Sequence, residues 1–313
     1  MASTTGVSAA ANRSGLRRHW RRSKYLWLLF FPCLVYYLVF KYAPMFGLVV
    51  SFKDFNVFKG IWASEWVGFK YYSMFFENLD FFKLIRNTFL LGIYKLLFGF
   101  SAPIAFALLL NEVKHAFFKR FVQTVSYLPH FISNVVVASM VIMFLSPTGG
   151  IVNRFISVFG FQPVNFMMDK ELFRAIYVIS DIWQHMGWSA IIYLAALTTI
   201  DPQQYEAAEL DGANRWGRLL HVTLPGIAPA IVIMFILDVG HILDIGFEKV
   251  FLLYNPATYE TADIMSTYVY RIGLVQGNYS YAAAIDLFTS IISFVFVFSA
   301  NYLSRKAGES SLW

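Results

Sequence analysis

The chain has 313 residues, of which 58% are hydrophobic and only 14% charged, and its formal net charge is +6. A water-soluble domain of this length cannot bury so many apolar side chains, whereas a lipid bilayer can solvate them, so the composition excludes an ordinary soluble protein. The single cysteine, Cys33, excludes a disulfide framework. The positive charge does not indicate a nucleic-acid partner, because much of it lies in the amino-terminal segment beside an apolar stretch.

The amino-terminal segment, residues 1–24, begins with small and polar residues and ends in a run of arginine and lysine. An apolar stretch follows directly, and no small-residue cleavage site interrupts it, which favours a retained first span over a signal peptide. We therefore expect a basic cytoplasmic tail over 1–24, a first transmembrane helix over 25–50 and an outer segment over 51–83.

Further apolar segments follow, each long enough to cross about 30 Å of hydrocarbon at about 1.5 Å per residue. We expect these spans at 84–110, 122–145, 173–198, 226–254 and 283–303. The sequence thus predicts an all-α polytopic membrane protein of six transmembrane helices, with a core over 84–303 and a tail over 304–313. Lysine and arginine are concentrated in the segments that this topology places inside, so we expect both termini in the cytoplasm.

The loop over 201–225, DPQQYEAAELDGANRWGRLLHVTLP, is the longest polar stretch in the second half of the chain. Asp201 is a good helix N-cap, and Pro202 suits the first helical position. Gly212 provides a break, because glycine accepts the left-handed conformation that ends a helix. A second helix is expected to follow and to end at Pro225. The loop is therefore predicted to be two short helices joined by a turn.

The same loop carries a recognisable spacing: Glu206-Ala207-Ala208, three residues, Gly212, nine residues, then Val222-Thr223-Leu224-Pro225. This resembles the EAA motif of ATP-binding-cassette (ABC) importer permeases, with Val222 where the pattern usually has isoleucine. The resemblance implies that the loop is a coupling helix which docks in a cleft of a separate ATPase subunit. The residues that it implies for coupling are Glu206, Ala207, Ala208, Asp211, Gly212, Leu224 and Pro225.

Two further segments, 41–45 and 52–55, resemble the branch of sugar-type permeases that handles complex oligosaccharides. The resemblance implies a type I, binding-protein-dependent importer of the bacterial cytoplasmic (inner) membrane, with a MetI-like bundle of five core helices. The implied partners are a second permease subunit in a heterodimer, two ATPase subunits that bind ATP and Mg, and a periplasmic or extracellular solute-binding protein. The implied cargo is an oligosaccharide, including acidic ones such as alginate fragments.

Several polar side chains interrupt the apolar spans, where ionisable groups are costly and usually functional. Asp238, His241, Asp244 and Glu248 recur at three- and four-residue spacing, which places them on one face of a continuous helix. We predict that these groups line a translocation path or contact a partner subunit, or else hydrogen-bond neighbouring helices. One possible ion pair joins Asp181 and Lys95. The path candidates are Lys95, Asp181, His185, Trp188, Asp238, His241, Asp244 and Asp286.

Other functions remain open from the sequence. An ion-driven secondary transporter could use Asp238, His241 and Asp244 as its relay, and an ABC permease could carry a non-sugar solute. A membrane enzyme is disfavoured, because the sequence has neither a catalytic constellation nor a metal-ligand spacing. The sequence has no Gly-Lys pair and therefore no Walker loop, so we expect no cofactor in this chain and ATP hydrolysis in a separate subunit.

Overall fold

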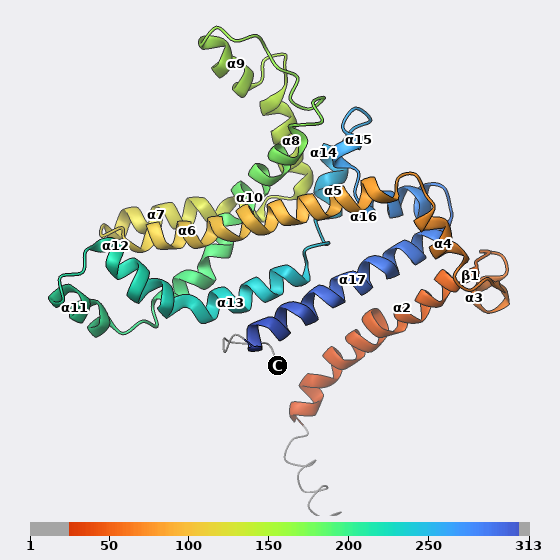
Figure 1. Cartoon of the computed structure of the whole chain (residues 1–313), viewed down its shortest axis with the longest axis horizontal. Coiled ribbons are helices and arrows are strands. Elements are labelled where there is room, and N and C mark those ends of the chain that lie inside the picture. Colours follow the sequence, from red (N-terminus) through yellow and green to blue (C-terminus); the bar gives the residue numbers. More distant parts are fainter. Residues whose placement is uncertain (1–24, 307–313) are drawn as a thin grey trace, which may run out of the picture. The chain divides into compact units, whose positions relative to one another are not determined.

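The computed structural model describes residues 25–306 and divides the chain into two compact units, Met1–Phe69 and Lys70–Trp313. The described parts of both units are predominantly helical, which confirms the predicted all-α class (Figure 1). The predicted basic tail over 1–24 and most of the predicted tail over 304–313 lie outside the described residues.

The first unit contains one long apolar helix, Tyr25–Phe52, followed by a small hairpin. The helix includes a π-helical turn and ends in a 3-10 segment: η1 (Leu38–Tyr42), α2 (Ala43–Met45) and η2 (Phe46–Phe52). In the hairpin, β1 (Lys53–Asp54) pairs antiparallel with β2 (Glu65–Trp66), and α3 (Gly60–Ala63) lies between them. Nearly all of the apolar side chains of the helix are exposed, as expected of a segment that faces lipid.

The second unit is a bundle in which the central helix is α10 (Phe173–Leu197). α10 contacts α6, α7, α13 and α14. Its Gly187 permits a close approach to α7, since a Cβ at this position would lie 2.2 Å from the carbonyl oxygen of Ser126. The elements before α10 are α4 (Lys70–Phe76), α5 (Phe81–Tyr94), η3 (Lys95–Gly99), α6 (Phe100–Asn111), α7 (Ala116–Tyr127), η4 (Leu128–Phe131), α8 (Asn134–Leu145) and α9 (Ile151–Val158). Those after it are α11 (Pro202–Leu210), α12 (Arg215–Arg218), η5 (Leu219–Thr223), α13 (Leu224–Gly240), α14 (Phe247–Leu253), α15 (Tyr259–Ala262), α16 (Met265–Tyr270), η6 (Arg271–Val275) and α17 (Tyr279–Lys306).

Four helices within residues 25–306 are long and apolar enough to cross a membrane: Tyr25–Phe52, Phe81–Asn111, Arg215–Gly240 and Tyr279–Lys306. A bent pair, Ala116–Phe131 with Asn134–Leu145, would make a fifth span. α10 is also 25 residues long, but its polar side chains lower its hydropathy. The structure therefore supports a membrane-embedded bundle, while the count of six spans remains a prediction.

The predicted third span, 122–145, is not one straight helix. The helix formed by α7 and η4 and the following helix α8 meet at a bend of 103°. Pro129 lies in the first turn of η4, and the Ser133 side chain then caps the start of α8 by accepting a hydrogen bond from the Val136 amide at 3.5 Å. The proline and the cap restart the helix in a new direction.

The predicted fifth span, 226–254, is also wrong at both ends. A single helix runs from Arg215 through Pro225 to Gly240, because the π-helical turn η5 precedes the proline and its wider turn accommodates the ring. The chain then breaks over 241–246 before α14 begins. Gly246 has φ +84°, a left-handed conformation that favours glycine, and it re-aims the backbone at this point.

Two clusters of buried side chains hold α10 on either side of its polar middle. The cluster near its amino end includes Leu91, Tyr177 and Ile245, and the Tyr177 hydroxyl donates a hydrogen bond to the Ile245 carbonyl. The cluster near its carboxyl end includes Tyr193 and Ile227. Packing and hydrogen bonds of this kind, rather than exclusion from water, hold helices together within a bilayer. They fix the chain break over 241–246 against α10.

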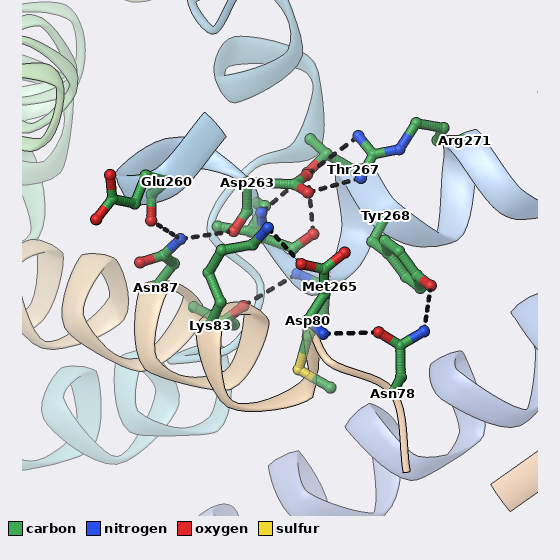
Figure 2. A network of polar contacts seen from close by, with 12 residues as sticks. Asn78, Asp80, Lys83, Asn87, Glu260, Asp263, Met265, Thr267, Tyr268 and Arg271 are labelled. Carbon is green, nitrogen blue, oxygen red and sulfur yellow. Dashed lines mark hydrogen bonds and ion pairs between the residues drawn. The ribbon is translucent and has the colours of Figure 1, made fainter. Parts of the chain in front are cut away.

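A polar network joins the start of α5 to the segment that contains α15 and α16 (Figure 2). The Asn87 side-chain amide donates to the backbone carbonyls of Glu260 (2.9 Å) and Asp263 (3.0 Å). The buried Asp263 carboxylate accepts from Thr267 at 2.8 Å and forms an ion pair with Arg271 at 2.6 Å. Burial would lower the pKa of Arg271, but the hydrogen bond and charge of Asp263 outweigh it and raise the pKa. The network therefore keeps its charges paired and fixes the end of the bundle opposite α11.

Candidate functional site

The loop over 201–225 has the predicted local structure. The Asp201 carboxylate caps α11 by accepting a hydrogen bond from the Gln203 amide at 2.9 Å. Gly212 adopts φ +79° directly after α11, and the Asn214 side chain then caps α12. The prediction of two short helices joined by a glycine turn is confirmed, except that the second helix continues into α13.

Two contacts fix α11 to the rest of the second unit, at one end of which it lies (Figure 1). The Tyr205 hydroxyl lies 3.1 Å from the Thr223 hydroxyl, and its ring packs on the cluster that contains Ile227. Arg218 forms an ion pair with Glu209 at 3.1 Å. Both contacts join α11 to the helix that continues into α13, so the loop is packed against the bundle.

The opposite face of the loop is open. Leu210 is 89% exposed and Trp216, in the first turn of the helix Arg215–Gly240, is 71% exposed, although both are large apolar side chains. Within residues 25–306, the Glu206 carboxylate makes no hydrogen bond or ion pair. Of the predicted coupling residues, Ala208 and Leu224 are half-buried, and the exposed ones are Glu206, Ala207, Asp211, Gly212 and Pro225.

A polar cavity of about 240 Å³ lies between α10, α13 and the helix formed by α5 and η3. It brings together five of the eight predicted path residues: Lys95, Asp181, His185, Asp238 and His241. Ser189 adds a hydroxyl to the lining. One wall is very tightly packed, since a Cβ on Gly92 would lie 2.1 Å from the Ile242 carbonyl oxygen. The helices that enclose the cavity are otherwise apolar, so its polar lining is the feature that requires a functional explanation.

Asp181 is paired, but not with the predicted partner. Its carboxylate lies 3.4 Å from the Lys249 ammonium and 3.4 Å from Nδ1 of His185. Lys249 is only 3% exposed and also donates to Gln184 Oε1 at 3.1 Å. The predicted ion pair with Lys95 is therefore wrong, because the break before α14 brings Lys249 to Asp181 instead.

The other three path candidates lie outside the cavity. The Trp188 ring stacks on His130, with ring centroids 4.6 Å apart and an interplanar angle of 1°. Asp244 is exposed in the chain break, so it does not share a helical face with Asp238 and His241 as predicted. Asp286 lines a separate cavity of about 330 Å³ beside Tyr270.

A chain of hydrogen bonds links α8, α10 and α14 beside the cavity, and the sequence did not identify it. The Gln184 amide donates to Asn134 at 3.1 Å, and the Asn134 amide donates to Glu248 at 2.7 Å. Polar residues inside predicted spans indicate that they have polar partners. Which residues pair depends on the bend after η4 and the break before α14, and neither was predicted from the sequence. The arrangement offers a polyhydroxylated solute both donors and acceptors within a mainly apolar bundle.

Curated relatives cover most of the chain. It is 45% identical over 293 residues to Protein LplB of Bacillus subtilis (strain 168), covering 94% of this chain and 92% of the relative. It is 46% identical over 292 residues to the polygalacturonan/rhamnogalacturonan transport system permease protein YteP of the same organism, covering 93% of this chain and 91% of the relative.

Solved structures agree with these relatives. The fold matches a chain in the crystal structure of a bacterial ABC transporter involved in the import of the acidic polysaccharide alginate, with a TM-score of 0.87 and 42% identity over 93% of this chain and 98% of that chain. It also matches a chain of a bacterial alginate ABC transporter in complex with an alginate pentasaccharide-bound periplasmic protein, with a TM-score of 0.87 and 41% identity over 94% of this chain and 99% of that chain. Residues 97–309 match the model of the binding-protein-dependent transport system inner membrane component family, and the chain belongs to that family.

Proposed function

We propose that the chain is one permease subunit of an ATP-driven ABC importer that takes up an oligosaccharide delivered by a solute-binding protein. The observation that carries the proposal is the loop over 201–225. It is packed against the bundle, yet it presents the unpaired Glu206 carboxylate and the exposed Leu210 and Trp216. A folded, exposed face of this kind suits a protein partner.

The partner on this loop is an ATPase subunit. The sequence has no Walker loop, so ATP and Mg bind to two separate ATPase subunits, and closure of these subunits moves α11. Glu206 makes the polar contact, Ala207 and Ala208 permit close approach, and Asp211 and Gly212 form the turn. Leu224 and Pro225 connect the loop to α13. The loop and both termini then lie in the cytoplasm, and the chain lies in the bacterial inner membrane.

The cargo is an acidic oligosaccharide that passes the cavity around Asp181. Both matched crystal structures are of alginate transporters, and alginate is an acidic polysaccharide. Lys95 can bind a sugar carboxylate, while Ser189 and the two histidines can hydrogen-bond hydroxyls. The exposed ring of Trp188 offers an apolar face to a sugar ring. A second permease subunit completes the path, since this chain encloses only part of it.

Uptake into proteoliposomes tests the proposal. The complex, its solute-binding protein and labelled uronate oligosaccharide should give uptake that requires ATP on the cytoplasmic side. Glu206→Lys and Gly212→Pro should leave the chain inserted but uncouple ATP hydrolysis from uptake, because one reverses the contact charge and the other cannot adopt φ +79°. Glu112→Lys, at an exposed position outside the loop, is the control. Uptake driven by an ion gradient without ATP would overturn the proposal and favour a secondary transporter.

A further inference from the structure

Arg174, on the first turn of α10, is a cation that the protein only partly satisfies. Its Nη2 donates to Asn87 Oδ1 at 3.0 Å. Its Nε is buried and has no hydrogen-bond partner. Within residues 25–306, no carboxylate lies within ion-pair distance of the guanidinium. Because Asn87 is itself held by the Glu260 and Asp263 carbonyls, the guanidinium is fixed in place.

The guanidinium lies at one end of a mainly apolar groove of about 520 Å³. The groove runs between α10 and the helix formed by α5 and η3. The walls of the groove include Tyr94, Phe98, Val178 and Ile182. Arg174 and Ile182 are eight residues apart on one helix, so the groove extends about 12 Å along α10. The groove therefore has a charged end and an apolar body.

The charged end carries one group of each sign. Glu171 is exposed, lines the same groove and, within the described part of the chain, makes no ion pair with Arg174 or any other side chain. Of the neighbouring charges, Lys170 and Glu260 are paired at 2.5 Å, whereas Arg86 only donates to the Glu260 backbone carbonyl at 3.4 Å. Glu171 and Arg174 are the charged groups that line the groove itself, and they can accept a cation and an anion side by side.

We propose that this groove, defined by Tyr94, Phe98, Glu171, Arg174, Val178 and Ile182, binds a phospholipid with a primary-amine headgroup, phosphatidylethanolamine. The phosphate lies on the Arg174 guanidinium, the ammonium donates to the Glu171 carboxylate, and an acyl chain fills the apolar groove. An oligosaccharide does not suit the groove, since its body offers few hydrogen-bonding groups for sugar hydroxyls. A bound lipid would hold the ends of α5 and α10 together at the membrane interface.

Native mass spectrometry of the purified complex, exchanged separately into phosphatidylethanolamine, phosphatidylglycerol and phosphatidylcholine, tests the proposal. Arg174→Gln should reduce retained phosphatidylethanolamine about tenfold, because a charge-assisted hydrogen bond is lost. Glu171→Gln should abolish the preference for phosphatidylethanolamine over phosphatidylcholine. Ala175→Trp, which fills the groove without changing its charge, should displace the lipid. Arg154→Gln, at an exposed arginine on α9, is the matched control and should retain it.

Equal retention by the wild-type chain, Arg174→Gln and Ala175→Trp would overturn the proposal. So would equal binding of the three lipids, or displacement of the lipid by a uronate trisaccharide, which would make the groove a substrate site. Absence of retained phosphatidylethanolamine on the wild-type complex would also refute it, because the second permease subunit would then cover the groove. The readout does not depend on transport, so its failure would leave the proposed function untouched.

Discussion

The buried ion pair between Lys249 and Asp181 allows the sharpest test of the packing around the cavity. Lys249→Met removes the ammonium and leaves Asp181, whose side chain is only 14% exposed, with His185 at 3.4 Å as its remaining partner. Breaking a buried pair on one side costs about 3–5 kcal/mol, since the remaining charge is buried without compensation. The retained histidine contact places the expected cost at the lower end of that range.

Thermal unfolding of the chain in lipid nanodiscs measures the effect. A loss of about 3 kcal/mol should lower the Tm by roughly 4–5 °C for a chain of this size. The double variant Lys249→Met, Asp181→Asn should recover most of the loss, because no charge is then left buried. Lys114→Met, at an exposed lysine between α6 and α7, is the control. The reasoning fails if Lys249→Met is no worse than this control, or if the double variant is as unstable as the single one.

Three further predictions concern packing, cargo and pH. Gly92→Ala should destabilise the chain by about 1–3 kcal/mol in the same assay, because its Cβ would lie 2.1 Å from a backbone carbonyl oxygen. Gly99→Ala meets its nearest neighbour at 3.6 Å and should be tolerated. Equal stability of the two variants would contradict the close approach at Gly92. Trp188→Ala should raise the KM for uptake about tenfold, because the contact between its ring and the sugar is lost. Trp183→Ala, at a similarly exposed tryptophan, should leave the KM unchanged. Equal KM values for the two variants would exclude Trp188 from the path. The hydrogen bond and charge of Lys170 lower the pKa of Glu260 from its ordinary 4.5, so this contact stabilises the fold above pH 4.5 and the stabilisation is lost as pH falls through the lowered pKa. Thermal unfolding between pH 3 and 6 should show this pH-dependent stabilisation in the wild-type chain and not in Glu260→Gln. The same pH profile in both chains would count against the contact.

The features that the sequence predicted correctly are local. The caps and the glycine turn of the loop depend on Asp201 and Gly212 and their immediate neighbours, so spacing alone identified them. The family comparisons confirm the permease assignment, which rested on the same loop. Lys95, Asp181 and Asp238 were recognisable because charges are rare in apolar spans.

The features that the sequence missed depend on contacts between distant segments. The break over 241–246 is held by the Tyr177 hydroxyl on the Ile245 carbonyl and by the close approach of Gly92 to Ile242. Hydropathy records none of these contacts, because it averages over residues that are neighbours in the chain and not in space. The pairing of Lys249 with Asp181 follows from the break, so it could not be predicted while 226–254 was taken as one helix.

Cross-linking from position 206 tests the central claim most directly. Cys33 is the only cysteine of this chain, so Cys33→Ser with Glu206→Cys gives this subunit one labelling site for a photoreactive maleimide in the assembled complex. We expect an adduct with the ATPase subunit, and none from a Glu112→Cys control. No adduct from position 206, or labelling of that cysteine by an impermeant reagent added outside intact cells, would contradict it.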